Sequence, residues 1–510
     1  MQSRRGRAFE AYRGIRYAQP PVGHLRFQPP VPILTYPEEV DASVEGPACP
    51  MPASAGYYLD EDCLRINVYT HNRNSSTLMP VIFYIHAGGF YSMSGRSDLA
   101  GPHYLLDRDL VLVTINYRLG SLGFLSTGDA LAPGNNGLKD QVAGLRWVQR
   151  NIAAFGGDPD LVTIAGCSAG SVSVLLHQLS PMSKGLFHRA ISMSGSPVGS
   201  MRSPRHLMHL AVRQAELSNC PTNSSKAIID CLKTKPWRDL GYSLRGFYEF
   251  GYNPVRIWNP VVEPDFGQER FLTEDPRDSI RSGRMHPVPY IISQTRKEFF
   301  WMAFNIIKND TLRTKMNKEW DKVAPISFQL PRNSSTETLA VLREAYLHDQ
   351  PLENDTASAE RLGQLYGDAI VAFPVHRTAN LMCRHSPQPV FYYEFAYTGA
   401  HSHYVDPDGL PRGAAHHDDL IYLFSLSYRF PAIGTEGLDA RLVDRMTGIW
   451  YTFAKHGDPN PRGLQPELEG LVWPPMTPKN RSYLEINTEF TIKTNLKEQR
   501  LGLLEMLYPV

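Results

Sequence analysis

A short run of small residues strongly constrains how this chain can fold. Ser168 is the centre of Gly166-Cys167-Ser168-Ala169-Gly170, which follows the apolar run 161–165 and precedes the segment 171–179. The run predicts a buried strand and the later segment a helix. A G-x-S-x-G turn between them is a nucleophile elbow, in which glycines on either side of the serine avoid a clash and its hydroxyl points away from the backbone. A plain glycine turn is the alternative.

Further apolar runs of strand length predict a sheet around this turn. They lie at 81–85, 110–115, 161–165, 190–193, 288–292 and 390–393. Runs that are apolar on both faces are typical of a sheet covered on both sides, and 137–153 has the apolar spacing of a helix. We therefore predict the α/β class, with a mostly parallel central sheet flanked by helices.

Two long stretches do not follow this alternation. Residues 197–285 and 299–378 have helical and irregular patterns, which we interpret as large insertions over the active site that form pocket walls. No linker, repeat or low-complexity stretch divides the 510 residues. We therefore expect one domain over 1–510.

The charge and hydropathy of the chain exclude some partners. The formal net charge is +1, so nothing indicates a nucleic acid or an anionic membrane as partner. The longest apolar runs are much shorter than the roughly 20 residues that span a bilayer. Oligomeric state cannot be predicted from these features.

Cysteines and sequons favour the secretory pathway. Cys49 and Cys63, and likewise Cys220 and Cys231, bracket short loops whose closure would be worth ~3 kcal/mol. Candidate N-glycosylation sequons begin at Asn74, Asn223, Asn309, Asn333, Asn354 and Asn480. The first residues nevertheless lack an apolar signal-peptide core. Either the protein is cytoplasmic with free thiols, or Met1 is not the true N-terminus.

A nucleophilic serine needs an oxyanion hole, a base and an acid that orients the base. The segment His86-Ala87-Gly88-Gly89-Phe90 follows the predicted strand 81–85. The amides of Gly88, Gly89 and Ala169 could form the oxyanion hole, each donor worth roughly 3 kcal/mol in the transition state. A strand-ending glycine turn is the alternative for this segment.

Two neighbouring histidines compete for the role of base. His416 and His417 lie in a polar loop, where we expect a mobile base exposed to water. A metal cluster is the alternative, but its spacing matches no zinc template; it would use His401, His403, His416, His417, Asp418 and Asp419. Glu298 follows the predicted strand 288–292 and is a candidate acid, although a solvated glutamate would fit the pattern equally well.

Taken together, the motifs resemble the type-B carboxylesterase and cholinesterase family of α/β-hydrolases, from about Arg13 to Leu484. The amino-acid sequence of residues 179–190 is most similar to that of invertebrate esterases of this group. The motifs that carry the resemblance are Tyr12-Arg13-Gly14-Ile15-Arg16-Tyr17-Ala18-Gln19-Pro20-Pro21-Val22-Gly23, Leu25-Arg26-Phe27, Glu61-Asp62-Cys63-Leu64, His86–Phe90, Asn116-Tyr117-Arg118-Leu119-Gly120, Phe155-Gly156-Gly157-Asp158-Pro159, Met193-Ser194-Gly195-Ser196 and Phe453-Ala454-Lys455-His456-Gly457-Asp458-Pro459.

The resemblance implies a role for each candidate. Ser168, Glu298 and His416 would be the catalytic triad, with Gly88, Gly89 and Ala169 as the oxyanion hole. Ser194 would lie near the acid. The family's first two disulfides match Cys49–Cys63 and Cys220–Cys231. Neither a metal nor an organic cofactor would be needed, and the partner would be a small-molecule ester.

The chain also departs from the family pattern. Cys167 stands where the family often has Glu, and the short Cys49–Cys63 loop contains no tryptophan, so choline esters are not expected. Phe299 stands in place of a glycine after the acid, and Cys383 lacks the partner of the usual third disulfide. The family's N-terminal strand and signal peptide precede the region where this chain begins. We therefore expect a truncated chain of a secreted or lumenal protein.

These observations predict a serine carboxylesterase that works through an acyl-enzyme. Alternatives are a non-catalytic adhesion or binding protein with the same fold, and an esterase specialised for a hormone or pheromone ester. Cys167 is interpreted as a small buried side chain rather than a regulatory thiol. Aromatic residues are candidates for the pocket walls, namely Phe90, Phe299, Phe300, Trp301 and Phe304.

Overall fold

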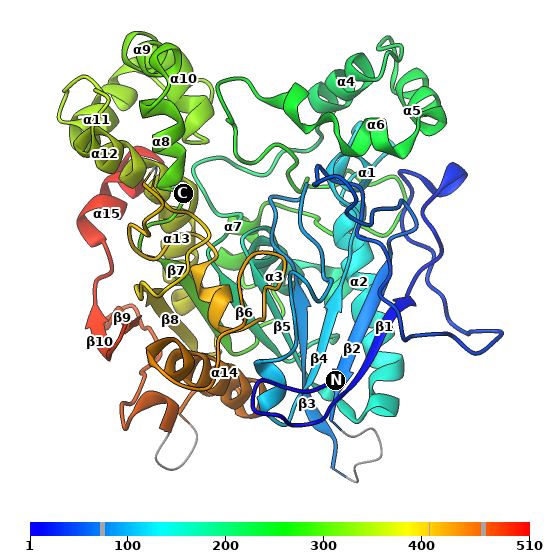
Figure 1. Ribbon diagram of the computed structural model, residues 1–510. Helices are drawn as coiled ribbons and strands as arrows, with labels where there is room; N and C mark the ends of the chain where they lie inside the picture. The colour runs from blue at the N-terminus through cyan, green and yellow to red at the C-terminus, as the bar shows by residue number, and fades with distance from the viewer. Residues whose placement is uncertain (72–76, 407, 461–465, 510) are drawn as a thin grey trace.

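A ten-stranded sheet runs through the centre of the molecule, in a computed structural model that describes residues 1–71, 77–406, 408–460 and 466–509 (Figure 1). The strand order is β1-β2-β4-β3-β5-β6-β7-β8-β9-β10. The strands are β1 (Glu10–Arg16), β2 (Arg65–Thr70), β3 (Met79–Ile85), β4 (Val111–Ile115), β5 (Gly157–Cys167), β6 (Arg189–Met193), β7 (Tyr290–Thr295), β8 (Val390–Phe395), β9 (Ser482–Ile486) and β10 (Phe490–Thr494). Neighbours from β4 to β9 pair in parallel, and β1, β2 and β10 pair antiparallel.

The two faces of this sheet pack into two separate apolar cores. Along β3, Val81, Phe83 and Ile85 contribute to one core, whereas Ile82 and Tyr84 contribute to the other. This alternation follows from the two-residue period of a strand. A strand buried on both faces reads as a continuous apolar run, as predicted for the central strands.

Helices cover both faces of the sheet (Figure 1). Apolar side chains of α2, α3 and α13 belong to one core, and those of α14 to the other. The helices are α1 (Gly120–Phe124), α2 (Asn136–Asn151), α3 (Ala169–Leu179), α4 (Met208–Leu217), α5 (Ser225–Thr234), α6 (Trp237–Gly241), α7 (Pro276–Arg281), α8 (Trp301–Ile307), α9 (Asp310–Lys318), α10 (Trp320–Ser327), α11 (Thr336–Leu347), α12 (Thr356–Gly367), α13 (Phe373–His385), α14 (Leu438–His456) and α15 (Glu498–Leu507). The predicted α/β architecture is thereby confirmed.

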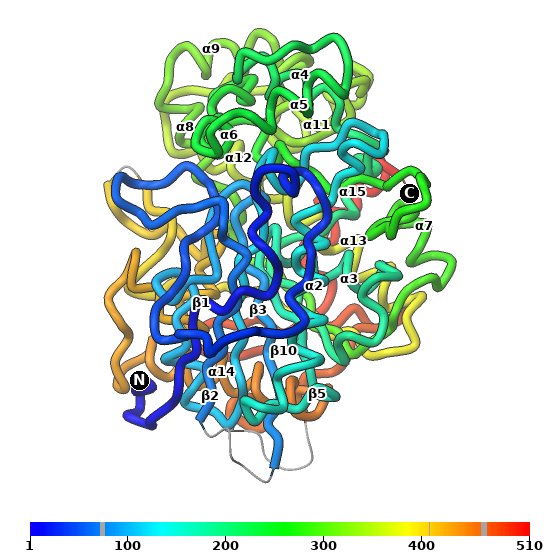
Figure 2. Tube along the Cα trace, turned by 90° about the vertical axis from the view of Figure 1, so that its right-hand side faces the viewer, coloured from blue at the N-terminus to red at the C-terminus, as the bar shows by residue number. Residues whose placement is uncertain are grey.

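The two helical insertions lie beyond the carboxyl ends of the parallel strands. Helices α4, α5 and α6 follow β6, and helices α8 to α12 follow β7, so both groups begin at the carboxyl ends of parallel strands. Both groups lie at the top of the molecule in Figure 1 and Figure 2, with α8 to α12 at the upper left and α4 to α6 at the upper right of Figure 1.

The structure contains four strands that the apolar runs did not indicate. Strands β1 and β10 are partly exposed, β2 contains Arg65 and Asn67, and β9 contains Ser482 and Glu485, so none forms a continuous apolar run. Strand β7 also begins later than expected and ends in the polar residues Ser293, Gln294 and Thr295. These are buried, and the whole strand pairs in register with β8.

Both predicted cysteine pairs, Cys49–Cys63 and Cys220–Cys231, are disulfide-bonded. Cys167 is a free, fully buried thiol, as expected for a small side chain beneath the elbow. Five of the sequon asparagines are exposed, and Asn74 lies outside the described residues. Within the described part of the chain, no helix combines the length and hydropathy that crossing a membrane requires.

Candidate active site

The sharp turn between β5 and α3 holds Ser168. Its backbone has φ 55° and ψ −115°, a strained conformation for a residue with a side chain. The turn is tight because a Cβ on Gly166 would lie 2.5 Å from the carbonyl carbon of Gly170, and one on Gly170 would lie 2.1 Å from the Ile85 oxygen. The Ser168 amide donates to the Met193 carbonyl over 2.8 Å, which fixes the turn against β6.

A buried carboxylate and a buried imidazole face each other near this turn. His416 Nδ1 lies 2.5 Å from Glu298 Oε2, and the Thr295 amide donates to Glu298 Oε1 over 2.7 Å. His416 is 1% exposed and Glu298 2% exposed. Burial alone would raise the pKa of Glu298, but the charge of His416 and the hydrogen bonds to the carboxylate outweigh it and lower that pKa.

The Ser194 hydroxyl also acts on Glu298. It lies close enough to contribute to the lowered pKa of the carboxyl group, although the buried oxygen makes no hydrogen bond of ordinary geometry. Ser194 follows β6, and its amide donates to the Ser293 carbonyl of β7 over 2.9 Å. The sheet therefore positions the serine beside the carboxylate.

The second ring nitrogen of His416 remains available. Nε2 is buried and has no hydrogen-bond partner among the described residues, and His416 and Ser168 line the same cavity. The expectation of a mobile base exposed to water is therefore wrong for this loop, because packing holds the ring. The Phe299 ring lies with its centroid 4.4 Å from that of His416.

The structure distinguishes between the two candidate histidines. Glu298 bonds to His416, whereas burial, followed by the charge of His416, lowers the pKa of His417 well below its usual value. Asp418 stabilises the loop that contains His416. Its carboxylate accepts hydrogen bonds from the Ala415 amide over 2.8 Å and from the His403 amide over 2.7 Å. No cluster of metal-ligating side chains occurs in the described ranges, so the metal alternative has no geometric support.

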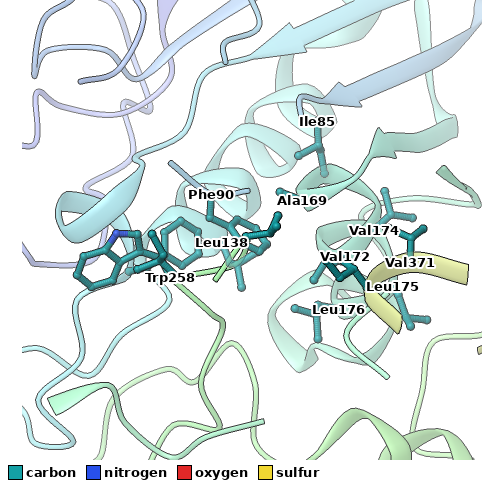
Figure 3. Packing of buried hydrophobic residues seen from close by; sticks show 14 of the residues in the cluster. Ile85, Phe90, Leu138, Ala169, Val172, Val174, Leu175, Leu176, Trp258 and Val371 are labelled. Atoms are coloured by element: carbon teal, nitrogen blue, oxygen red, sulfur yellow. The ribbon is translucent and has the colours of Figure 1, made fainter. Parts of the chain in front are cut away.

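The glycines predicted for an oxyanion hole line the same cavity. Gly88 and Gly89 have φ of +107° and +59°, and a Cβ on Gly88 would lie 2.0 Å from the Ser92 carbonyl oxygen. His86 supports this loop, since its ring stacks on Tyr117 and burial lowers its pKa to about 4, which keeps it neutral. Ala169, Phe90 and Val172, which are labelled in Figure 3, line the cavity as well.

The cavity has a volume of about 580 Å³, within the range of small-molecule sites. Of the aromatic wall candidates, Phe90 and Phe299 line it. Phe300 and Phe304 line a different cavity, and Trp301 stacks on Tyr404, so the prediction for these three residues is wrong. Trp301 begins α8 and packs behind the wall, with 6.2 Å between its ring centroid and that of His416.

Sequence patterns did not indicate several side chains around the site. Asp419 is fully buried beneath the triad candidates, and burial, followed by the charges of Glu298 and Asp418, raises its pKa to about 8. Arg256 lines the cavity from an insertion, and Ile370 and Val371 line it from a π-helical segment, Asp368–Ala372. The adjacent acids at 418 and 419 were the only sequence feature that indicated any of these side chains.

The parallel strands, the elbow after β5 and the acid after β7 define an α/β-hydrolase fold. The model of the carboxylesterase family matches residues 1–504. A carboxylic ester hydrolase of Bombus ignitus is 35% identical, with 96% of this chain and 88% of that protein covered. Juvenile hormone esterase of Tribolium castaneum is 35% identical, with 90% of this chain and 82% of that protein covered. The chain therefore belongs to the carboxylesterase family and is a carboxylesterase.

A solved structure supports the same assignment. The crystal structure of juvenile hormone esterase from Manduca sexta, with OTFP covalently attached, superposes with a TM-score of 0.85 at 29% identity, covering 98% of this chain and 96% of that one. These relatives favour an enzyme over the alternative of a non-catalytic binding protein.

Proposed function

We propose that Ser168, Glu298 and His416 form the catalytic triad of this carboxylesterase. The observation that carries the proposal is the Nδ1 bond of His416 to the buried Glu298, which leaves Nε2 free at the cavity that Ser168 lines. Glu298 selects the tautomer of His416 with a proton on Nδ1 and stabilises the imidazolium that forms during the reaction. Ser194 assists by positioning the carboxylate.

The reaction is two-step acyl transfer. His416 Nε2 takes the proton of Ser168 as Oγ attacks the ester carbonyl, and the Gly88, Gly89 and Ala169 amides stabilise the oxyanion. His416 then donates the proton to the leaving alcohol. Water that is activated by His416 hydrolyses the acyl-enzyme, so the reaction needs no cofactor.

Hydrolysis of short-chain nitrophenyl esters by the wild type and by Ser168→Ala tests this proposal. We expect a burst and steady turnover in the wild type, and loss of at least about a thousandfold in the variant. An organophosphate should label Ser168 only in the wild type. Equal turnover by a folded Ser168→Ala variant would contradict the triad.

We also propose that residues 1–510 act as one domain in the secretory pathway or outside the cell. Two disulfides and exposed sequon asparagines support this location, because disulfides persist in oxidising compartments. Treatment of the protein from its native source with an N-glycosidase should lower its mass. An unchanged mass together with free thiols at Cys49 and Cys63 would contradict it.

A further inference from the structure

The cavity beside Ser168 contains a cationic side chain that no carboxylate balances. Arg256 lines the cavity, and its Nε donates to Gln329 Oε1, a neutral amide oxygen. Among the described residues, no carboxylate forms an ion pair with it. Burial is the single cause that shifts its pKa, lowering it to about 10, so the guanidinium remains charged at neutral pH.

Cations that are buried more deeply in this protein face a carboxylate. Arg118 bonds to Asp140 over 2.7 Å, and Lys139 bonds to Glu263 over 2.6 Å. Pairing of this kind is the rule because burying an isolated charge is unfavourable. Arg256 is half-buried, lacks such a partner and borders the reaction cavity, so it is a candidate for binding an anion from the substrate.

The rest of the cavity wall supports this interpretation. No Asp or Glu occurs among its described lining residues, and Arg429 supplies a second cation. Arg429 is exposed, whereas the side chains of His403 and His417 are buried and have lowered pKa values, so both rings are neutral near pH 7. The cavity thus has a net positive charge, which attracts anionic molecules.

The position of Arg256 indicates which part of an ester it would contact. A Cβ built on Gly199 would lie 4.0 Å from the Arg256 Nη2 atom, so the guanidinium is near the segment after β6 and near Gln329. The ring of His416, by contrast, packs against Phe299 and His417. Because His416 must protonate the leaving alcohol, the alcohol lies on the side of the cavity that His416 forms. The acyl chain then extends toward the wall that Arg256 forms.

We propose that Arg256 binds a carboxylate at the far end of the acyl group, so that this enzyme prefers half-esters of dicarboxylic acids to uncharged esters of equal length. The proposal rests on the triad proposed above. A guanidinium suits this role because its planar fork can donate two parallel hydrogen bonds to one carboxylate. The apolar residues Val172 and Val371 would contact the methylene chain.

The first test compares two methyl esters on the wild-type protein in a pH-stat. Methyl hydrogen adipate carries the carboxylate, and methyl hexanoate has the same acyl length without it. We expect kcat/KM to be about tenfold to a hundredfold higher for the half-ester, the range of a hydrogen bond to a charged group. Equal or lower kcat/KM for the half-ester would overturn the proposal, and this comparison needs no variant.

Variants then assign the preference to Arg256. In Arg256→Met the half-ester preference should fall about tenfold or more, and Arg256→Lys should retain part of it. The control Arg332→Gln removes the same charge from an exposed ion pair with Glu249, and it should keep the wild-type ratio. An unchanged ratio in Arg256→Met would overturn the assignment.

Two further arms separate the remaining outcomes. A butanoate ester of 4-hydroxybutanoate carries its carboxylate on the alcohol, and preference for it over methyl hydrogen adipate would overturn the acyl placement. If folded wild-type protein hydrolyses none of these esters, the triad proposal fails. Calorimetric binding of methyl hydrogen adipate then decides the role of Arg256, because affinity that is equal in the wild type and in Arg256→Met would overturn it.

Discussion

At the scale of single residues, Asp419 is a carboxyl group in an unusual state. Among the described residues neither of its oxygens makes a hydrogen bond of ordinary geometry, and it is fully buried. Burial raises its pKa from 3.8 to about 8, with smaller contributions from the charges of Glu298 and Asp418. The folded protein therefore holds this carboxyl group protonated at neutral pH.

This state makes the free energy of unfolding depend on pH. Between 3.8 and about 8 the folded protein keeps the Asp419 proton and the unfolded chain releases it, so stability falls as pH rises through this window. The Asp419→Asn side chain cannot ionise, so this variant should lack the loss of stability. Between pH 4 and pH 8 its free energy of unfolding should gain on the order of several kcal/mol relative to that of the wild type. Urea unfolding across this pH range measures it.

An exposed aspartate serves as the control for this prediction. Asp230 is exposed and forms an ion pair with Lys226, so Asp230→Asn should leave the pH dependence close to that of the wild type. If Asp419→Asn and the wild type lose stability equally between pH 4 and pH 8, the carboxyl group is not protonated in the folded protein.

Sequence patterns and the family resemblance predicted some of these residues and not others. Ser168 and the glycines around it follow a local rule, because the turn between a strand and a helix dictates them. Asp419 and Arg256 obey no local rule, since their burial and lack of a counter-charge arise from segments far apart in the chain. Phe299 was predicted as a wall residue, but its φ of 51° and its packing against the His416 ring were not.

At the scale of elements, the junction of β3, β5 and α3 determines the position of Ser168. Gly170→Ala would place a Cβ 2.1 Å from the Ile85 carbonyl oxygen, which is backbone and cannot rotate away. We expect a loss of about 3 kcal/mol in the free energy of unfolding, together with loss of ester hydrolysis. Urea unfolding and a nitrophenyl ester assay measure the two effects.

A glycine in open space is the matched control for that prediction. Gly502 lies in the exposed part of α15, and a Cβ there would meet no atom within 4 Å. Gly502→Ala should therefore raise stability by about 0.5–1 kcal/mol through its higher helix propensity. A Gly170→Ala variant as stable as the wild type would contradict the steric account of the elbow.

The same junction explains which elements were predictable. Strands β3 and β5 are buried on both faces and read as apolar runs, whereas β1 and β10 lie at the edges, where exposed side chains interrupt the pattern. In the sequence, the insertions were recognisable only because strand-like and helix-like runs do not alternate there. Their helices pack against one another and, as α6 does against α1, against helices from other parts of the chain. Local periodicity does not encode this arrangement.

At the scale of the whole molecule, the two disulfides close loops of similar length in different places. Cys49 and Cys63 are separated by 14 residues, and Cys220 and Cys231 by 11. Met51 and Tyr57 of the first loop line the reaction cavity, whereas none of the described residues from 220 to 231 does. Tyr57 also packs against Tyr428, which is distant in the sequence and lines the same cavity.

Removing each disulfide should therefore separate stability from activity. We compare two double variants, Cys49→Ser with Cys63→Ser and Cys220→Ser with Cys231→Ser. Each should lose about 3 kcal/mol in the free energy of unfolding, because the unfolded chains gain similar conformational freedom. Only the first should also raise KM for short-chain esters, since only its loop forms a wall of the cavity. Urea unfolding and steady-state kinetics on both variants measure this, and an equal rise of KM in the second variant would mean that general loosening of the fold, rather than the cavity wall, controls substrate binding.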